Sequence, residues 1–237
     1  MPLLAAVPIH GGVSNEMPRL VRGANRDSPP LWVDAAEALT AGGDLRPEYF
    51  GPGRQQRIQD VRARNIDGCT SFQTVAPSMP WYGTVEDRVS KAFTVVSGEI
   101  TSARTGFYAG VPGTLFAVRV TARPKMFGHS AVAKSLYAFV VDADISTPLG
   151  HICAAQGAGD AVTPAVGDRV ILFAHLPAPD EARQLVKVEP RFGLVIERGN
   201  TLLGNVQSKS GVLGSLGEVL RAVEKSPSLR EQPSSSR

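Results

Sequence analysis

The sequence predicts a mainly β protein, built as a small barrel or sandwich with short flanking helices and an irregular N-terminal extension. Its 24 Gly and 18 Pro among 237 residues favour many turns and short elements. Its apolar fraction of 43% is high enough to form a hydrophobic core. In the last two thirds of the chain, apolar stretches recur at roughly ten-residue spacing, which is typical of short strands joined by turns.

A tight turn at Val166, Gly167, Asp168 and Arg169 introduces the clearest strand. Glycine adopts a positive φ at little cost, and an aspartate side chain can bond to nearby backbone groups. The strand that follows, over residues 169–174, contains a run of four large apolar residues, Val170-Ile171-Leu172-Phe173, with no polar face. This run therefore predicts a strand that is buried on both sides.

Further strands are predicted where apolar residues alternate or cluster between turn residues. Gly98 lies inside the first of them, where a glycine usually marks a bulge or a bend. The glycine-rich residues 105–113 are predicted to form a loop, and Gly199-Asn200 a tight turn. The predicted strands cover residues 93–103, 114–121, 135–143, 149–155, 184–189, 192–197 and 201–203.

Short helices are predicted on either side of these strands. Thr84 and Asp87 have the spacing of a capping box and predict the start of a short helix. Apolar residues at helical spacing predict a terminal helix over residues 213–223. Short helical turns are predicted within residues 34–40 and 54–64.

The chain is predicted to divide into three parts. Proline and glycine interrupt residues 1–83 every few positions, which predicts an irregular extension with short helices. Residues 84–225 are predicted to form the β domain with its C-terminal helix. Residues 226–237 are rich in serine and proline, and we expect a disordered tail there. If the extension docks on the domain, the expected anchors are Trp32, Phe50 and Trp81.

Three segments of the predicted domain carry a resemblance to known proteins. They are Val96-Ser97-Gly98-Glu99-Ile100, then Leu115 to Val120, then Val166 to Phe173. This order resembles uncharacterised bacterial, often exported, proteins with an OB-like β-barrel, and it is similar to netrin-type modules. The resemblance covers about residues 84–198. It implies an OB-like fold and an extracytoplasmic location, and it implies no catalytic residue.

Charge and hydropathy argue against two classes of protein. A formal net charge of +3, from 25 basic and 22 acidic residues, is too small to predict general binding of polyanions. No apolar run reaches the roughly 18 to 20 residues needed to cross a bilayer, so no transmembrane segment is predicted. The first residues lack a basic region and contain Pro2 and Pro8, so they predict no signal peptide.

One group of basic and aromatic residues has the chemistry of a binding surface. OB barrels stack nucleic-acid bases on aromatic side chains beside a basic groove, so this mixture suits a single strand. Acidic residues of the same domain, including Glu99 and Asp168, weigh against nucleic acid. The candidate binding residues are Arg104, Phe107, Tyr108, Arg119, Arg123, Lys125 and Phe127.

Two carboxylates and a histidine form a smaller candidate group. Asp142 and Asp144 lie two residues apart, so they share one face of a strand, and His151 lies beyond a turn. Such a group could hold a divalent metal ion. The favoured interpretation is a solvated strand end, and no metal or cofactor is predicted.

Cys69 and Cys153 are the two cysteines of the chain. A disulfide between them is the favoured interpretation and suits an exported protein, whereas two free thiols suit a reducing compartment. A three-ligand zinc site that includes His151 is the remaining alternative.

Enzyme motifs are poorly represented in this sequence. Gly128-His129-Ser130-Ala131 does not match the Gly-x-Ser-x-Gly motif of a serine nucleophile. The glycines within 105–113 lack the Lys and Ser/Thr of a phosphate loop. We therefore expect a non-enzymatic binding or accessory module whose barrel loops contact a protein or another ligand. Single-stranded nucleic-acid binding through the barrel face is the alternative.

Overall fold

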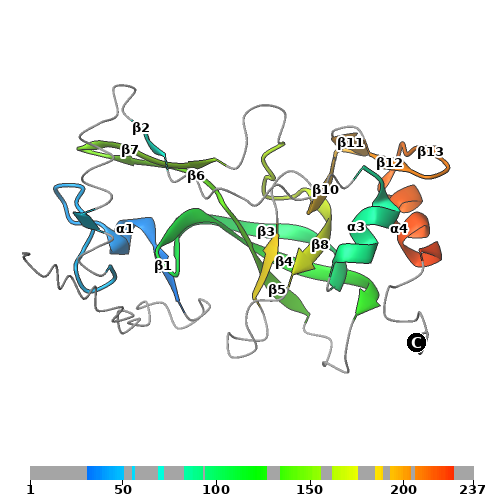
Figure 1. Ribbon diagram of the computed structural model, residues 1–237, viewed down its shortest axis with the longest axis horizontal. Coiled ribbons are helices and arrows are strands. Elements are labelled where there is room, and N and C mark those ends of the chain that lie inside the picture. The colour runs from blue at the N-terminus through cyan, green and yellow to red at the C-terminus, as the bar shows by residue number, and fades with distance from the viewer. Residues whose placement is uncertain are drawn as a thin grey trace, which may run out of the picture.

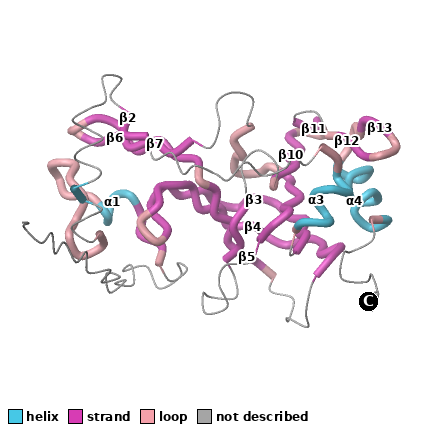
Figure 2. Tube along the Cα trace, viewed as in Figure 1, coloured by secondary structure: helices cyan, strands magenta, loops and turns pink. Residues whose placement is uncertain are grey.

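A computed structural model shows an elongated protein that consists mainly of β-strands (Figures 1 and 2). The structure describes residues 31–50, 55–56, 69–71, 83–92, 94–126, 134–155, 162–175, 185–188, 193–203 and 206–226. The predicted mainly β class is confirmed. None of the helices in these ranges is long and apolar enough to cross a membrane.

Eight strands form the main sheet in the order β1-β3-β4-β5-β9-β8-β10-β11, and β3 also pairs with β8. Within this sheet, the described strands pair antiparallel except for β5 with β9, which is a parallel pairing. The strands are β1 (Trp32–Asp34), β3 (Thr94–Tyr108), β4 (Val111–Met126), β5 (Ser135–Val140), β8 (Arg169–His175), β9 (Leu185–Val188), β10 (Leu194–Arg198) and β11 (Thr201–Leu203).

Two smaller sheets and three helices complete the described structure. The second sheet has the order β2-β7-β6, and a hairpin joins β12 to β13. Their strands are β2 (Cys69–Ser71), β6 (Asp142–Thr147), β7 (Gly150–Ala155), β12 (Gln207–Ser208) and β13 (Gly211–Val212). The helices are α1 (Ala35–Ala38), α3 (Val85–Lys91) and α4 (Leu216–Lys225).

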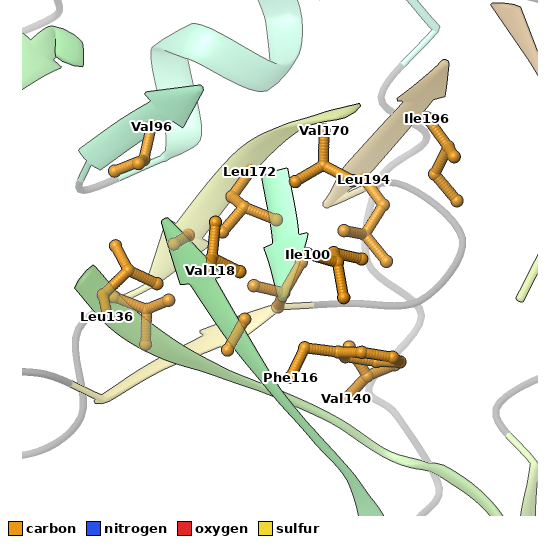
Figure 3. Packing of buried hydrophobic residues seen from close by; sticks show 14 residues of the cluster. Val96, Ile100, Phe116, Val118, Leu136, Val140, Val170, Leu172, Leu194 and Ile196 are labelled. Atoms are coloured by element: carbon orange, nitrogen blue, oxygen red, sulfur yellow. The ribbon is translucent and has the colours of Figure 1, made fainter. Parts of the chain in front are cut away.

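Apolar side chains pack on both faces of the main sheet. One face carries side chains of β3, β4, β5, β8, β9 and β10 that point toward one another, including Val96, Phe116 and Leu172 (Figure 3). On the other face, side chains such as Ile171 and Phe173 pack against α3 and α4. In the strand predicted at residues 169–174, residues 170–174 are therefore buried on both sides, as the apolar run indicates, whereas Arg169 at its start is exposed.

The prediction of a loop at residues 105–113 is wrong, because this segment is the tip of the long β3–β4 hairpin. Ala109 and Gly110 both have positive φ, 48° and 72°, which is the geometry of a two-residue hairpin turn. On either side of the turn, Tyr108 pairs with Val111, and Phe107 with Pro112. The twist of this turn suits the paired strands, which keep one register as far as Ser102, opposite Ala117. Beyond that point the register shifts between Ile100 and Ser102 and again on either side of Ser97, next to Gly98.

Part of the predicted N-terminal extension packs against this hairpin. The strand β1 pairs antiparallel with the end of β3, Trp32 opposite Tyr108. Trp32 and Phe50 are 1% and 2% exposed, so both predicted anchors are buried. Gly43, with a φ of +87°, approaches the side chain of Pro148 in the turn between β6 and β7. Trp81 lies outside the described residues.

The capping box and the turn before β8 are confirmed in atomic detail. Thr84 Oγ1 accepts a hydrogen bond from Asp87 N, and Asp87 Oδ2 accepts one from Thr84 N. Gly167 has a φ of +90°, and Asp168 Oδ2 accepts from Ala165 N at 2.8 Å.

Other boundaries differ from the predictions. The residues predicted as one strand over 135–143 belong to β5 and β6, with a bend at Val141, and the terminal helix begins at Leu216. The helix predicted within 54–64 is described only at residues 55–56. In the predicted tail, Ser226 is the C-cap of α4, and residues 227–237 lie outside the described structure.

Candidate functional site

Two of the candidate binding residues belong to the hydrophobic interior. Phe107 and Tyr108 are 1% and 2% exposed. Phe107 packs edge-on against Phe50, with ring centroids 4.9 Å apart, and Tyr108 lies 5.2 Å from the ring of Phe139. The interpretation of these aromatic side chains as a contact surface is therefore wrong, because the N-terminal segment and the second sheet cover the hairpin tip.

Arg104 connects the hairpin to β1. Its Nη1 lies 3.2 Å from Asp34 Oδ2, and Asp34 Oδ1 accepts from Trp32 Nε1 at 2.9 Å. This contact holds the N-terminal strand in place. Of the remaining candidates, Arg123 and Lys125 lie on β4 with side chains outside the described structure, and Phe127 lies outside it entirely.

Arg119 belongs to a row of charges that crosses four neighbouring strands, which we call the charged row. Its members are Arg119 on β4, Glu99 on β3, Arg169 on β8 and Glu197 on β10. Each stands directly opposite the next in the strand register. Directly opposed residues of antiparallel strands point to the same face, so the four side chains form one alternating line.

Two ion pairs connect members of the charged row. Arg119 Nη2 lies 2.5 Å from Glu99 Oε2, and Arg169 Nη1 lies 2.5 Å from Glu197 Oε2. The arginine side chains are 63% and 58% exposed, whereas that of Glu197 is 6% exposed. Glu197 Oε1 also accepts from Leu216 N at 3.3 Å, so the row ends at the start of α4. The two exposed arginines are thus each held by a carboxylate, and that of Glu197 is buried.

A second ion pair lies at the neighbouring turn. Arg198 donates to both oxygens of Asp168, from Nε at 2.8 Å and from Nη2 at 2.7 Å. These hydrogen bonds lower the pKa of the Asp168 carboxyl below its ordinary value, against the opposing effect of burial. Arg198 Nη2 also donates to Thr163 O, so this pair fixes the segment that leads into β8.

The small sheet brings three of the remaining candidates together. His151 Nδ1 lies 2.7 Å from Asp144 Oδ1, and Cys153 Sγ lies 3.7 Å from the same oxygen. Asp142 bonds instead to Thr163, and burial raises the pKa of its carboxyl above the ordinary value. In the described part of the chain, no group of three His, Cys, Asp or Glu side chains is suited to a metal ion. The divalent-metal alternative therefore gains no support.

The two cysteine-bearing strands are neighbours. The strand β2 pairs parallel with β7, with Cys69 opposite His151 and Ser71 opposite Cys153. No cysteine among the described residues is a free thiol.

Sequence reasoning did not single out Arg169 or Glu197 as site residues. Each is a charged residue at one end of an apolar strand, where a solvated strand end is the usual interpretation. Only the pairing register aligns them with Glu99 and Arg119, and register depends on which strands become neighbours. Comparison with known proteins finds no matching family model and no matching curated protein.

Proposed function

We propose that this protein is a non-enzymatic binding or accessory module that contacts a protein partner through the charged row. The alternating row is the observation that carries the proposal. Its two arginines are more than half exposed, and their ion pairs hold them in place before a partner arrives. Preorganised charges of both signs can complement the mixed charges of a folded protein surface, and they favour specificity.

We propose further that the strands behind the row form an OB-type barrel. The pairings β3–β4, β4–β5, β5–β9, β9–β8 and β8–β3 follow one another around a ring and support this proposal. An apolar cluster drawn from these five strands and from β10 would fill the interior of such a barrel (Figure 3). OB barrels bind ligands on their strand faces and loops, which agrees with a binding role.

The nucleic-acid alternative is weakened by the positions of its residues. Stacking on bases requires exposed rings, and Phe107 and Tyr108 are buried. Arg104 and Arg119 are each paired with a carboxylate, which reduces their attraction for phosphates. A labelled single strand should therefore bind weakly, without the steep loss of affinity with salt that marks phosphate contacts.

Site-specific photo-crosslinking in cells that naturally produce the protein tests the proposed partner surface. Ser135 is exposed and stands opposite Arg119, so a photoreactive residue there samples the row. Val212, 71% exposed on β13, provides the control position. We expect one discrete protein adduct from position 135 and none from 212. The adduct should disappear in an Arg119→Glu, Arg169→Glu double variant.

Adducts of the same sizes from both positions, or none from position 135, would contradict the proposal. So would an adduct that persists in the double variant while circular dichroism shows that variant to be folded.

We also propose the Cys69–Cys153 disulfide and an extracytoplasmic location. The neighbouring strands β2 and β7 support the disulfide. The location rests on the resemblance to exported bacterial proteins and on the compartments in which disulfides persist. Fractionation of producing cells tests it, since protein confined to the cytoplasm would contradict it.

A further inference from the structure

Arg88, on the last turn of α3, is a partly buried cation that forms no ion pair with the described residues. Its guanidinium carbon lies 5.9 Å from the centre of the Phe173 ring. Its Nε is buried and has no hydrogen-bond acceptor. Arg104, Arg119, Arg169 and Arg198 each form an ion pair, so Arg88 departs from the pattern of these arginines.

The acidic side chains nearest to it in sequence are already engaged. Glu86 Oε2 accepts from Lys209 N at 3.1 Å, and Asp87 Oδ2 accepts from Thr84 in the capping box. On the adjacent α4, Glu218 Oε2 accepts from Gly214 N at 2.7 Å. These three carboxylates are thus committed elsewhere, and none of the ion pairs among the described residues includes Arg88.

An uncompensated, partly desolvated guanidinium is costly in a folded protein. Burial lowers the pKa of Arg88, because removing the guanidinium from water disfavours its charged form. A carboxylate that binds the Nη side of the guanidinium would offset this cost. The stacked ring of Phe173 also limits the orientations of the guanidinium, so less entropy is lost when an acceptor binds.

We propose that Arg88 anchors a carboxylate from an acidic segment of the partner protein. This inference rests on the proposed function and extends it to a second contact point. The guanidinium fork matches a carboxylate with two parallel hydrogen bonds. A dianionic phosphate fits less well, because one arginine neutralises only half of its charge. The carbonyl groups at the end of α3 add further repulsion.

Acetylated tetraglutamate is a suitable probe, with acetylated tetraglutamine as its neutral control. Each is titrated into the whole protein at constant ionic strength while the Nε–H resonances of the arginines are followed by NMR. We expect a saturable shift of the Arg88 resonance with tetraglutamate and none with tetraglutamine. Inorganic phosphate at the same ionic strength should bind more weakly.

An Arg88→Met variant supplies the second measurement. Methionine keeps an apolar side chain near Phe173 and removes the charge, so the thermal midpoint should equal or exceed that of the unchanged protein. Affinity for tetraglutamate should fall by about tenfold or more. Arg221→Met, at an exposed position on α4, should change neither quantity.

Three results would overturn the inference. They are an Arg88 resonance that tetraglutamate does not move, an equal or tighter response to phosphate, and a clear fall of the thermal midpoint in Arg88→Met alone. The last would show that the guanidinium is a structural element. Crosslinking at position 135 is a separate measurement, so the contact at Arg88 can fail while the charged row remains supported.

Discussion

At the scale of single residues, Phe107 should behave as a core residue although it lies close to a turn. It is 1% exposed and packs against Phe50 at the join between the N-terminal segment and the hairpin. Truncating a buried phenylalanine removes apolar contact and leaves a cavity. We expect Phe107→Ala to lower the free energy of unfolding by about 3 to 5 kcal/mol, measured by urea denaturation.

Phe173→Ala, in the buried strand β8, should cost a similar amount. The matched control is Val166→Ala, because Val166 is 62% exposed and should change stability by less than about 0.5 kcal/mol. A loss for Phe107→Ala no greater than that control would show that the hairpin tip is open to solvent.

Asp142 and Asp168 should affect stability in opposite directions as pH changes. Burial raises the pKa of Asp142 in the folded protein, so its favourable contribution is complete below the ordinary aspartate pKa and is lost as pH rises. The Asp142→Asn variant should therefore be more stable than the unchanged protein at about pH 7, and the two should be equally stable in acid. The gain should be below about 1 kcal/mol, because the carboxyl is only partly buried.

The hydrogen bonds from Arg198 lower the pKa of Asp168, so its contribution is present above the ordinary pKa and is lost as pH falls. Asp168→Asn should be less stable than the unchanged protein at neutral pH, and the difference should shrink in acid. Urea denaturation across the acid range tests both variants. If the free energies of unfolding of the two variants, each taken relative to the unchanged protein, changed with pH in the same way, the opposite pKa shifts of Asp142 and Asp168 would be contradicted.

Residue chemistry could be predicted from the sequence where it depends on near neighbours. Thr84 with Asp87, and Asp168 with the turn before it, form local hydrogen bonds that their spacing already indicates. The environment of Phe107 could not be predicted, because it depends on Phe50, more than fifty residues earlier in the chain. Partners so distant in sequence are set by the fold as a whole.

At the scale of elements, the positions of the strands could be predicted from the sequence better than the segments that connect them. The strands of the main sheet follow from alternating or continuous apolar residues, and most lie within a few residues of their predicted positions. The glycines of residues 105–113 indicate a break in the pattern, but here Gly106 and Gly113 lie within paired strands. Their lack of a side chain admits close neighbours, Val33 and Phe139 respectively.

The strand β2 supplies the prediction that belongs to this scale. If Cys69 and Cys153 are bonded, the bond fastens β2 to β7 and closes a loop of more than 80 residues. The chain-entropy estimate for such a loop is on the order of 4 kcal/mol. We expect protein purified under oxidising conditions to resist alkylation without a reductant, and to gain two alkyl groups after reduction, as measured by mass spectrometry.

Cys69→Ser and Cys153→Ser variants serve as matched controls, because each should expose one reactive thiol. Alkylation of two thiols in unreduced wild-type protein would eliminate the disulfide. Cys153 would then act as a small packing residue of β7.

At the scale of the whole molecule, the N-terminal segment closes one end of the long hairpin. Trp32 packs edge-on against Phe139 at 6.1 Å, and Ala109 N donates to Leu31 O at 3.0 Å. In Figure 1, β1 and α1 lie at the far end of the hairpin from α3 and α4. The charged row and Arg88 both lie on the side covered by α3 and α4, so the segment can stabilise the fold without blocking either proposed contact.

Gly106 allows this segment to dock, and a methyl group there should release it. A Cβ at Gly106 would clash with the backbone oxygen of Val33 and with the ring of Trp32. We expect Gly106→Ala to weaken the β1–β3 pairing while the apolar cluster around Leu172 stays intact. Limited trypsin digestion should then cut faster after Arg46, because proteases act on transiently opened backbone.

Gly83→Ala is the matched control, since a Cβ at Gly83 would meet no atom within 4 Å and its substitution should leave the cleavage rate unchanged. Mass analysis of the fragments distinguishes local release from global unfolding. Local release gives early cleavage after Arg46 and a persistent fragment that contains β3 to α4, whereas global unfolding degrades both parts together. Equal cleavage rates in Gly106→Ala and Gly83→Ala would show that β1 docking does not depend on the close approach at Gly106.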